Sequence, residues 1–140
     1  GELRNHLIRL VEEKRLRSRV YFVGELSPED VPNFLRAGDI FAFPSIFEAF
    51  GFALVEAMMM GLPVVASDID AHREVVGDAG LLLPIGKLEV WVDRIWELIS
   101  DPVKRALYAQ RAYQRASRFD VESMVDGYIS ALFGWESNEG

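Results

Sequence analysis

The chain has 140 residues, of which half are hydrophobic and 26% are charged, which is typical of one soluble globular domain and not of a disordered chain. Its formal net charge of −7 argues against sequence-independent binding to nucleic acid, which requires a basic surface. The sequence has no cysteine, no signal-peptide core and no apolar run near the roughly 18 residues of a transmembrane segment, so we expect a cytoplasmic domain without disulfides or thiolate metal sites.

Four short apolar runs predict the strands of a parallel sheet. None of them alternates apolar with polar residues, and such continuous runs are typical of strands that are buried on both faces. Turn residues follow each run and mark its end. The four runs cover residues 20–23, 40–43, 64–66 and 81–83.

Helical patterns with recognisable start signals lie between and after these runs. Ser27-Pro28 and Asp101-Pro102 each place a capping side chain ahead of a proline at the first helical position. Asp120 is the expected cap of the last helix. Two apolar stripes at helical spacing mark further helices, one over Leu3, Leu7, Leu10 and Val11 and one over Trp91, Ile95 and Leu98.

The alternation of helices with apolar strands predicts an α/β fold with a Rossmann-like, doubly wound parallel sheet of about four strands flanked by helices. We expect one domain over residues 1–134 and a flexible tail over residues 135–140. The chain opens directly into a helix, so we expect that the preceding strand, at the centre of the sheet, is missing. The strand at residues 40–43 would then have an unpaired edge. Because such edges recruit other strands, we expect a homodimer of this chain.

Two glutamates after the second apolar run are the leading candidates for binding a ligand. Ligands of an open parallel sheet bind at the carboxyl ends of its strands, where Glu48 lies in a loop. Glu56 follows eight positions later, about 12 Å along a helix axis, which suits two ends of an extended ligand rather than one reacting atom. The helix around Glu56 is otherwise almost wholly apolar. Because a buried unpaired carboxylate costs free energy, we interpret Glu56 as a ligand-binding residue rather than a solvated surface charge.

Gly51, at the start of this helix, has no side chain and therefore lets a ligand approach the backbone. The amides around Phe52 and Ala53, together with the helix dipole, favour an anion at that point. The segment predicts hydroxyl groups at Glu48, a phosphate over the helix start and a second pair of hydroxyl groups at Glu56. A sugar nucleotide has this layout.

The segment and its flanks contain a specific combination of motifs. They are Pro44-Ser45, Glu48-Ala49-Phe50-Gly51, Glu56-Ala57-Met58 and Gly61-Leu62-Pro63-Val64-Val65-Ala66-Ser67, with flanking matches at residues 19–24, 37–41, 74–76, 79–82 and 101–102. This combination resembles the donor-binding signature of the retaining GT-B glycosyltransferases of group 1, and the resemblance extends over nearly the whole chain. Residues 66–71 are most similar to the mannosyltransferase branch, which includes phosphatidylinositol mannosyltransferases.

The resemblance implies a role for each matching position. Glu48 would contact the hydroxyls of the donor sugar and stabilise the transition state, and Glu56 would bind the ribose hydroxyls. The implied backbone contacts are Phe50 and Gly51 to the sugar, Phe52 and Ala53 to the diphosphate, and Gly24, Glu25 and Leu26 to the base. The substrate would be a UDP- or GDP-linked sugar, from which a hexose such as mannose or glucose passes to an acceptor. The family retains the anomeric configuration and needs no metal ion or other cofactor.

The sequence also departs from the family pattern. In the family, an arginine and a lysine bind the diphosphate, and we expect that the elements that carry them precede Gly1 and that the acceptor-binding N-terminal domain is also missing from this chain. A basic cluster at Lys14, Arg15, Arg17 and Arg19 is interpreted as a solvated face. The missing charge-assisted hydrogen bonds are worth about 1.5–3 kcal/mol each, so we expect the isolated chain to be inactive. Peripheral membrane contact of the whole enzyme stays open.

Two other functions remain open from the residues. Asp68 and Asp70 could hold a divalent ion in a metal-dependent transferase, although acids at the start of a short helix are more often caps. A non-catalytic nucleotide-binding or scaffold module is the second alternative. His72 lies in the same loop, and a lone histidine is more often structural than a ligand contact. The tryptophans are interpreted as packing anchors, and a sugar-stacking role stays open for them: Trp91, Trp96 and Trp135.

Overall fold

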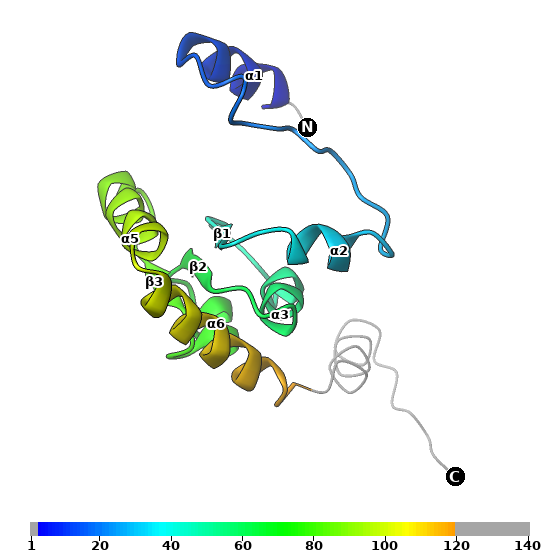
Figure 1. Cartoon of the computed structure of the whole chain (residues 1–140), viewed down its shortest axis with the longest axis vertical. Coiled ribbons are helices and arrows are strands. Elements are labelled where there is room, and N and C mark those ends of the chain that lie inside the picture. The colour runs from blue at the N-terminus through cyan, green and yellow to red at the C-terminus, as the bar shows by residue number, and fades with distance from the viewer. Residues whose placement is uncertain (1–2, 120–140) are drawn as a thin grey trace. The chain divides into compact units, whose positions relative to one another are not determined.

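The computed structural model describes residues 3–119, and the chain divides between Asp30 and Val31 into two compact units (Figure 1). The predicted cap Asp120, Trp135 and the predicted tail lie outside the described residues. No helix in the described part of the chain is long and apolar enough to cross a membrane.

The first unit contains the predicted N-terminal helix but not the predicted strand. Helix α1 (Arg4–Glu13) confirms the stripe of leucines. Residues 20–23 form no ladder, and their side chains are exposed, so the prediction of a strand there is wrong for this structure. The physical reason is that a strand exists only with a neighbour to accept and donate its backbone hydrogen bonds, and sequence pattern does not supply that neighbour.

The predicted helix start at Ser27 is also wrong. Helix α2 (Val31–Arg36) begins three residues after Pro28, the predicted first helical position. The Ser27 hydroxyl donates to Oδ2 of Asp30 at 2.7 Å, and the amide of Asp30 donates to the Ser27 carbonyl at 3.0 Å. The serine therefore stabilises a turn with the Asp30 carboxylate, in place of capping a helix.

The second unit contains a parallel sheet in the order β1 (Phe41–Phe43), β2 (Val64–Ser67), β3 (Leu81–Leu83). The predicted α/β class with a parallel sheet is confirmed, with three strands rather than four in the described residues. Phe41 pairs with Val64, and Val65 pairs with Leu81. Among the strands of the described residues, the central strand β2 is buried along its whole length, whereas the outer strands, which pair on one side there, are not.

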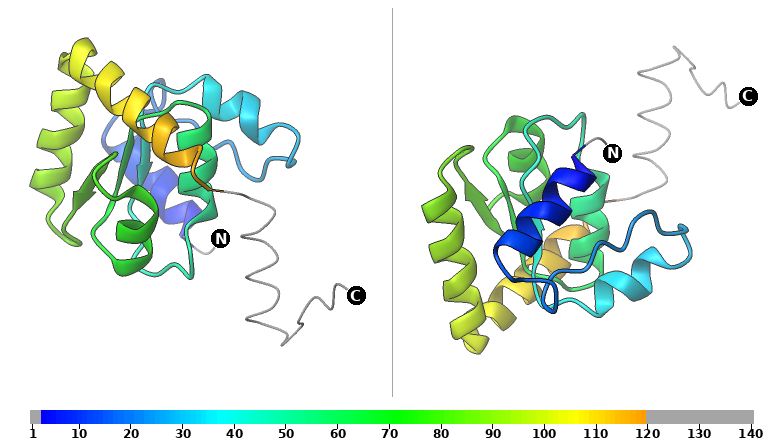
Figure 2. Two further views of the ribbon diagram at one scale, coloured as in Figure 1. Left: turned by 90° about the horizontal axis from the view of Figure 1, so that it is seen from below. Right: turned by 90° about the horizontal axis from the view of Figure 1, so that it is seen from above.

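Helices cover both faces of this sheet. They are α3 (Phe52–Met59), α4 (Asp70–Val76), α5 (Leu88–Ser100) and α6 (Pro102–Ala116). Val64 and Ala66 of β2 pack with α3 and α6, whereas Val65 packs with α5, because successive residues of a strand point to opposite faces. Figure 2 shows α3 and α5 on opposite sides of the strands. The second unit is thus a three-layer α/β/α arrangement whose loops after β1 and β2 carry the candidate site.

The start of α6 follows the sequence prediction. Asp101 is the N-cap, its side chain accepts a hydrogen bond from the Lys104 amide at 2.9 Å, and Pro102 opens the helix. This cap depends only on residues within one turn, which is why the sequence identifies it.

Candidate functional site

The loop between β1 and α3 holds Glu48 at the carboxyl end of the sheet. Its carboxylate is half-buried, and Oε1 lies 3.2 Å from the hydroxyl of Ser45. The same hydroxyl lies 2.9 Å from the carbonyl of Phe47, so it donates to one or the other and restrains the loop. The sequence motif includes Ser45, but the contact between Ser45 and Glu48 was not predicted from it. Its spacing, three residues before an acid in a loop, was the available signal.

The start of α3 is built as predicted. Gly51 is buried and is the N-cap, with a φ of 95° in the left-handed region that favours glycine. The amides of Leu54 and Val55 donate to its carbonyl at 2.9 and 3.4 Å, which closes the first turn. Phe52 and Ala53 occupy that turn and are half-buried. The positive end of the helix dipole therefore lies at Gly51, next to the loop that carries Glu48.

The burial argued for Glu56 from the sequence is wrong. Leu54, Val55, Ala57 and Met58 of α3 are buried, but Glu56 is exposed. At 3.6 residues per turn, even a nearly apolar helix keeps one face outward, and Glu56 lies on it. The carboxylate therefore needs no ligand to offset desolvation. Its position on an exposed face of the helix that starts at Gly51 still leaves it accessible to one.

The remaining predicted binding residues, Gly24, Glu25 and Leu26, belong to the first unit and are described within it. Gly24 has a φ of 80°, and a Cβ added there would meet no atom within 4 Å. Glu25 is exposed and Leu26 is half-buried. The structure brings together the site residues of the second unit, from Glu48 to Glu56.

The basic cluster of the first unit is a solvated face, as predicted. All four side chains of the cluster are exposed, and Arg17 pairs with Glu12. The pairing raises the pKa of Arg17, chiefly through the hydrogen bond to Glu12.

Asp68 and Asp70 are not helix caps, which corrects the sequence interpretation. The N-cap of α4 is Ile69, and it makes no side-chain cap. Both carboxylates instead bind Arg73, with 2.6 Å from Nε to Oδ1 of Asp68 and 2.8 Å from Nη1 to Oδ1 of Asp70. The hydrogen bond from Arg73 is the main cause that lowers the pKa of the Asp68 carboxyl. Within residues 3–119 no group of three or more His, Asp or Glu side chains is placed to hold a metal ion.

His72, on α4, is buried next to the ends of β1 and β2. Its Nδ1 lies 2.8 Å from the carbonyl oxygen of Ser67, and its ring centroid lies 5.4 Å from that of Phe43. Its Nε2 is buried and has no hydrogen-bond partner among the described residues. The structural role expected for a lone histidine accounts for one ring nitrogen and leaves the other unexplained.

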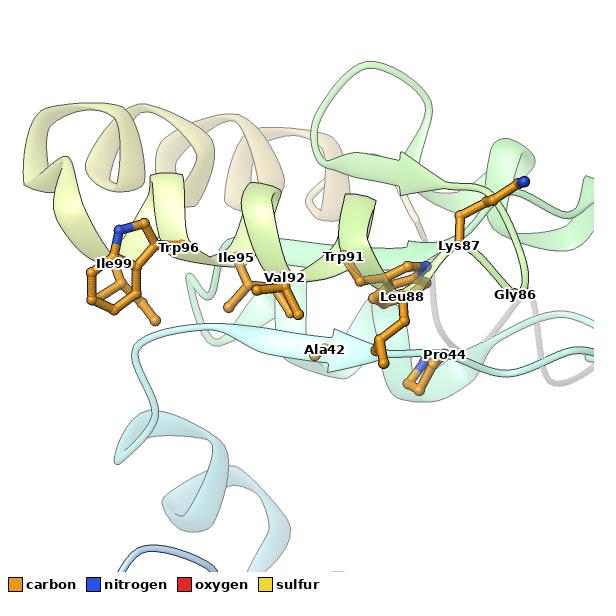
Figure 3. Close-up of a pocket in the computed structure, with 10 residues that line it drawn as sticks. All are labelled: Ala42, Pro44, Gly86, Lys87, Leu88, Trp91, Val92, Ile95, Trp96 and Ile99. Atoms are coloured by element: carbon orange, nitrogen blue, oxygen red, sulfur yellow. The ribbon is translucent and has the colours of Figure 1, made fainter. Parts of the chain in front are cut away.

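The two described tryptophans differ. Trp91 is 9% exposed and donates from Nε1 to the Pro84 carbonyl at 3.0 Å, so it is a packing anchor as predicted. Trp96 is 65% exposed, and the same prediction is wrong for it. It lines an apolar groove of about 590 Å³ between α5 and β1, in which Val92 and Ile95 face Ala42 (Figure 3).

Comparison with known proteins identifies a family. The sequence profile described as "Glycosyl transferases group 1" matches residues 1–115. The phosphatidyl-myo-inositol mannosyltransferase of Mycolicibacterium smegmatis is 34% identical over 128 residues, which is 89% of this chain and 33% of the relative. The D-inositol 3-phosphate glycosyltransferase of Rhodococcus opacus is 32% identical over 127 residues, or 89% of this chain and 28% of the relative.

Solved structures are similar in fold. Anabaena HepE in complex with UDP and glucose is 32% identical and superposes with a TM-score of 0.80, over 94% of this chain and 36% of that one. Sucrose-phosphate synthase from Thermosynechococcus elongatus is 27% identical, also with a TM-score of 0.80, over 96% of this chain and 35% of that one. The chain spans about a third of the length of these relatives and has the fold of part of a GT-B glycosyltransferase. It belongs to the group 1 glycosyltransferases.

Proposed function

We propose that this chain is the donor-nucleotide-binding part of a retaining hexosyltransferase, which transfers mannose or glucose from a UDP- or GDP-linked sugar to an acceptor. One observation carries the proposal. Glu48, restrained by Ser45, lies in the loop that leads into the left-handed Gly51, and Glu56 lies on the exposed face of the helix that Gly51 begins. Two carboxylates flanking one helix N-terminus suit the two hydroxyl-bearing ends and the central diphosphate of a sugar nucleotide.

Each residue has one task in this proposal. Glu48 accepts hydrogen bonds from the donor sugar and stabilises the positive charge that develops on it in the transition state. The backbone of Phe50 and Gly51 contacts the sugar, and the first turn at Phe52 and Ala53 contacts the diphosphate. Glu56 accepts from the ribose hydroxyls. Gly24, Glu25 and Leu26 face the base.

The names of the relatives support the substrate class. The relative from Mycolicibacterium smegmatis is a phosphatidyl-myo-inositol mannosyltransferase, and the solved structure of Anabaena HepE is a complex with UDP and glucose. Because the chain spans about a third of such proteins, we propose that another domain binds the acceptor and that cationic side chains outside this chain bind the diphosphate. The isolated chain is then inactive. The absence of cysteine fits a reducing compartment, and we propose the cytoplasm.

The proposed transfer needs no metal ion. The rival reaction would use Asp68 and Asp70 as metal ligands, but Arg73 binds both carboxylates. A cation would have to displace a guanidinium from two ion pairs before it could enter. The non-catalytic module remains the second alternative, since binding and chemistry are separate properties of the same fold.

We also propose that this chain self-associates through the β1 edge. In the described residues β1 pairs only with β2, and the groove beside it exposes Val92, Trp96 and Ile99. Unpaired strand edges and exposed apolar surface both favour association. We assign the occupant as a second copy, because each copy brings an unpaired edge and an apolar α5 face of its own to the interface.

Titration calorimetry with UDP, GDP and ADP, followed by turnover of a panel of nucleotide sugars by the complete enzyme, tests the main proposal. We expect UDP or GDP to bind, and the matching sugar donor to be turned over in EDTA with retention of anomeric configuration. Binding without turnover would indicate the non-catalytic module. Loss of turnover in EDTA would indicate the metal-dependent reaction.

A further inference from the structure

The ring of His72 lies at the carboxyl edge of the sheet, in contact with the ends of β1 and β2 and close to the start of α3. Nδ1 is bonded to the Ser67 carbonyl at the end of β2, and the ring packs on Phe43 at the end of β1. A Cβ added to Gly51, at the start of α3, would lie 3.6 Å from Cδ2 of the ring. The histidine is fully buried.

The contact with Ser67 assigns the proton within the neutral ring. A carbonyl oxygen only accepts hydrogen bonds, so Nδ1 must donate and carry the proton. In the neutral tautomer that this contact selects, Nε2 presents a lone pair and accepts a hydrogen bond. Nε2 is therefore a buried hydrogen-bond acceptor that no donor among residues 3–119 satisfies.

Gly51 keeps space clear beside that nitrogen. Cδ2, the atom that a Gly51 side chain would meet, is bonded directly to Nε2. The same added Cβ would lie 3.4 Å from Cδ1 of Leu54, so a side chain here would occupy the space next to the ring edge. The left-handed φ of 95° is a second reason for glycine at this position. The buried acceptor Nε2 of His72 thus lies close to Gly51, the residue without a side chain at the start of α3.

We propose that His72 is a specificity-determining residue, whose Nε2 accepts a hydrogen bond from one hydroxyl group of the donor sugar as that sugar lies over Gly51. The proposal rests on the proposed function. The diphosphate is excluded as the partner, because its oxygens are acceptors and cannot donate to a lone pair. The ribose is assigned to Glu56, five residues or roughly 7.5 Å farther along the helix. Nε2 is buried in this structure, so the proposal requires that loop 44–51 moves when the sugar binds.

Two substitutions in the complete enzyme separate the two ring nitrogens. His72→Asn keeps an amide that can donate to the Ser67 carbonyl but has nothing at the position of Nε2. His72→Gln extends far enough to return an acceptor to that position. We expect His72→Asn to raise the Kd for the nucleotide sugar about 3- to 10-fold, the loss of one neutral hydrogen bond, and to leave the Kd for the nucleotide alone unchanged. His72→Gln should recover part of the loss.

Deoxy donors identify the hydroxyl. Among donors that each lack one sugar hydroxyl, one should bind wild type and His72→Asn equally well, because both have then lost the same contact. His6→Asn is the matched control, since His6 is the other histidine of the chain and is exposed on α1. An equal loss of affinity for nucleotide and nucleotide sugar, or a Tm shift with no change in either Kd, would overturn the proposal and leave His72 a structural residue.

A measurement on the wild-type enzyme covers the case in which the variants do not fold. The ¹⁵N resonance of His72 Nε2 should move when the nucleotide sugar binds and stay in place when the nucleotide alone binds. A resonance that is indifferent to the sugar would refute the hydrogen bond. If wild type binds neither ligand, the proposed function fails as well, and this outcome is distinct from binding without discrimination at His72.

Discussion

Arg115 of α6 is hydrogen-bonded to Val75 of α4, with Nε donating to the carbonyl oxygen at 2.5 Å. Its Nη2 also donates to the Glu74 carbonyl at 2.6 Å. The last carbonyls of a helix have no partners within the helix, so Arg115 satisfies two of them and joins α6 to α4. Gly77 makes room, since a Cβ there would lie 2.7 Å from Cζ of Arg115.

Replacing Arg115 should destabilise the fold. We expect Arg115→Ala to lower the free energy of unfolding by about 1–3 kcal/mol, because it leaves two helix-end carbonyls without donors. Gly77→Ala should lower the free energy of unfolding by a comparable amount for two reasons. The added methyl group would displace the guanidinium of Arg115, and the positive φ of Gly77 is unfavourable for alanine. Urea unfolding measures both. Gln114→Ala, an exposed change on the same helix, should stay within about 0.5 kcal/mol, and a similar loss in all three variants would argue against this role.

Replacing Glu56 should weaken ligand binding and leave stability intact. Because the side chain is exposed on α3, Glu56→Ala should change the free energy of unfolding by less than about 0.5 kcal/mol. Loss of charge-assisted hydrogen bonds to the ribose should raise the Kd for UDP or GDP about 10- to 100-fold. Calorimetry on the complete enzyme measures this change. Unchanged nucleotide affinity would identify Glu56 as an ordinary surface charge.

Replacing Glu48 should affect turnover more than donor binding. We expect Glu48→Gln to lower kcat by about 100-fold or more, with a small change in the KM for the donor, because its main contact forms in the transition state. Ser45→Ala should lower kcat less, since it removes only the restraint on the carboxylate. Steady-state kinetics of the complete enzyme give both constants. Wild-type kcat in Glu48→Gln would remove it from the catalytic machinery.

The Asp68–Arg73 pair should make stability depend on acid pH. Arg73 lowers the pKa of Asp68 below its ordinary value of 3.8, so the ionised carboxylate is more stable in the folded state than in the unfolded state. This contribution is present above the unfolded pKa and is lost as the pH falls through the lower, folded value. The difference in urea midpoint between wild type and Asp68→Asn should therefore be constant from about pH 5 to 7 and shrink below about pH 4. Asp93→Asn, an exposed change on α5, is the control, and a gap that grows on acidification would contradict the assignment.

Self-association should depend on the groove residue Trp96. Trp96→Glu places a charge in the apolar surface between α5 and β1, so we expect it to shift this chain from dimer to monomer in light scattering. Val103→Glu introduces the same charge at an exposed position that does not line the groove and should leave the dimer intact. A monomeric wild type would refute self-association. A dimer here and a monomeric complete enzyme would mean that another segment of the polypeptide covers the groove.

Features that depend on neighbouring residues in sequence could be predicted from the sequence. The N-cap at Asp101 and the helix start at Gly51 lie within one turn of the residues that define them. The three apolar runs of the second unit form strands, because each is long enough and apolar enough for burial between helices. The placement of Glu48 in the loop before Gly51 and of Glu56 in the helix after it could be predicted from the same local patterns.

Features that depend on partners distant in space were decided by the tertiary structure. Residues 20–23 have the pattern of a strand and no ladder, and Glu56 is exposed although the residues around it are buried. His72 packs on Phe43 at the end of β1, and its Nε2 has no hydrogen-bond partner among the described residues. Pairing, burial and satisfaction of a polar atom are properties of two groups that meet. The residue type determines which hydrogen bonds or apolar contacts a group can make. Whether a neighbouring group is placed to make them is determined only by the packed fold.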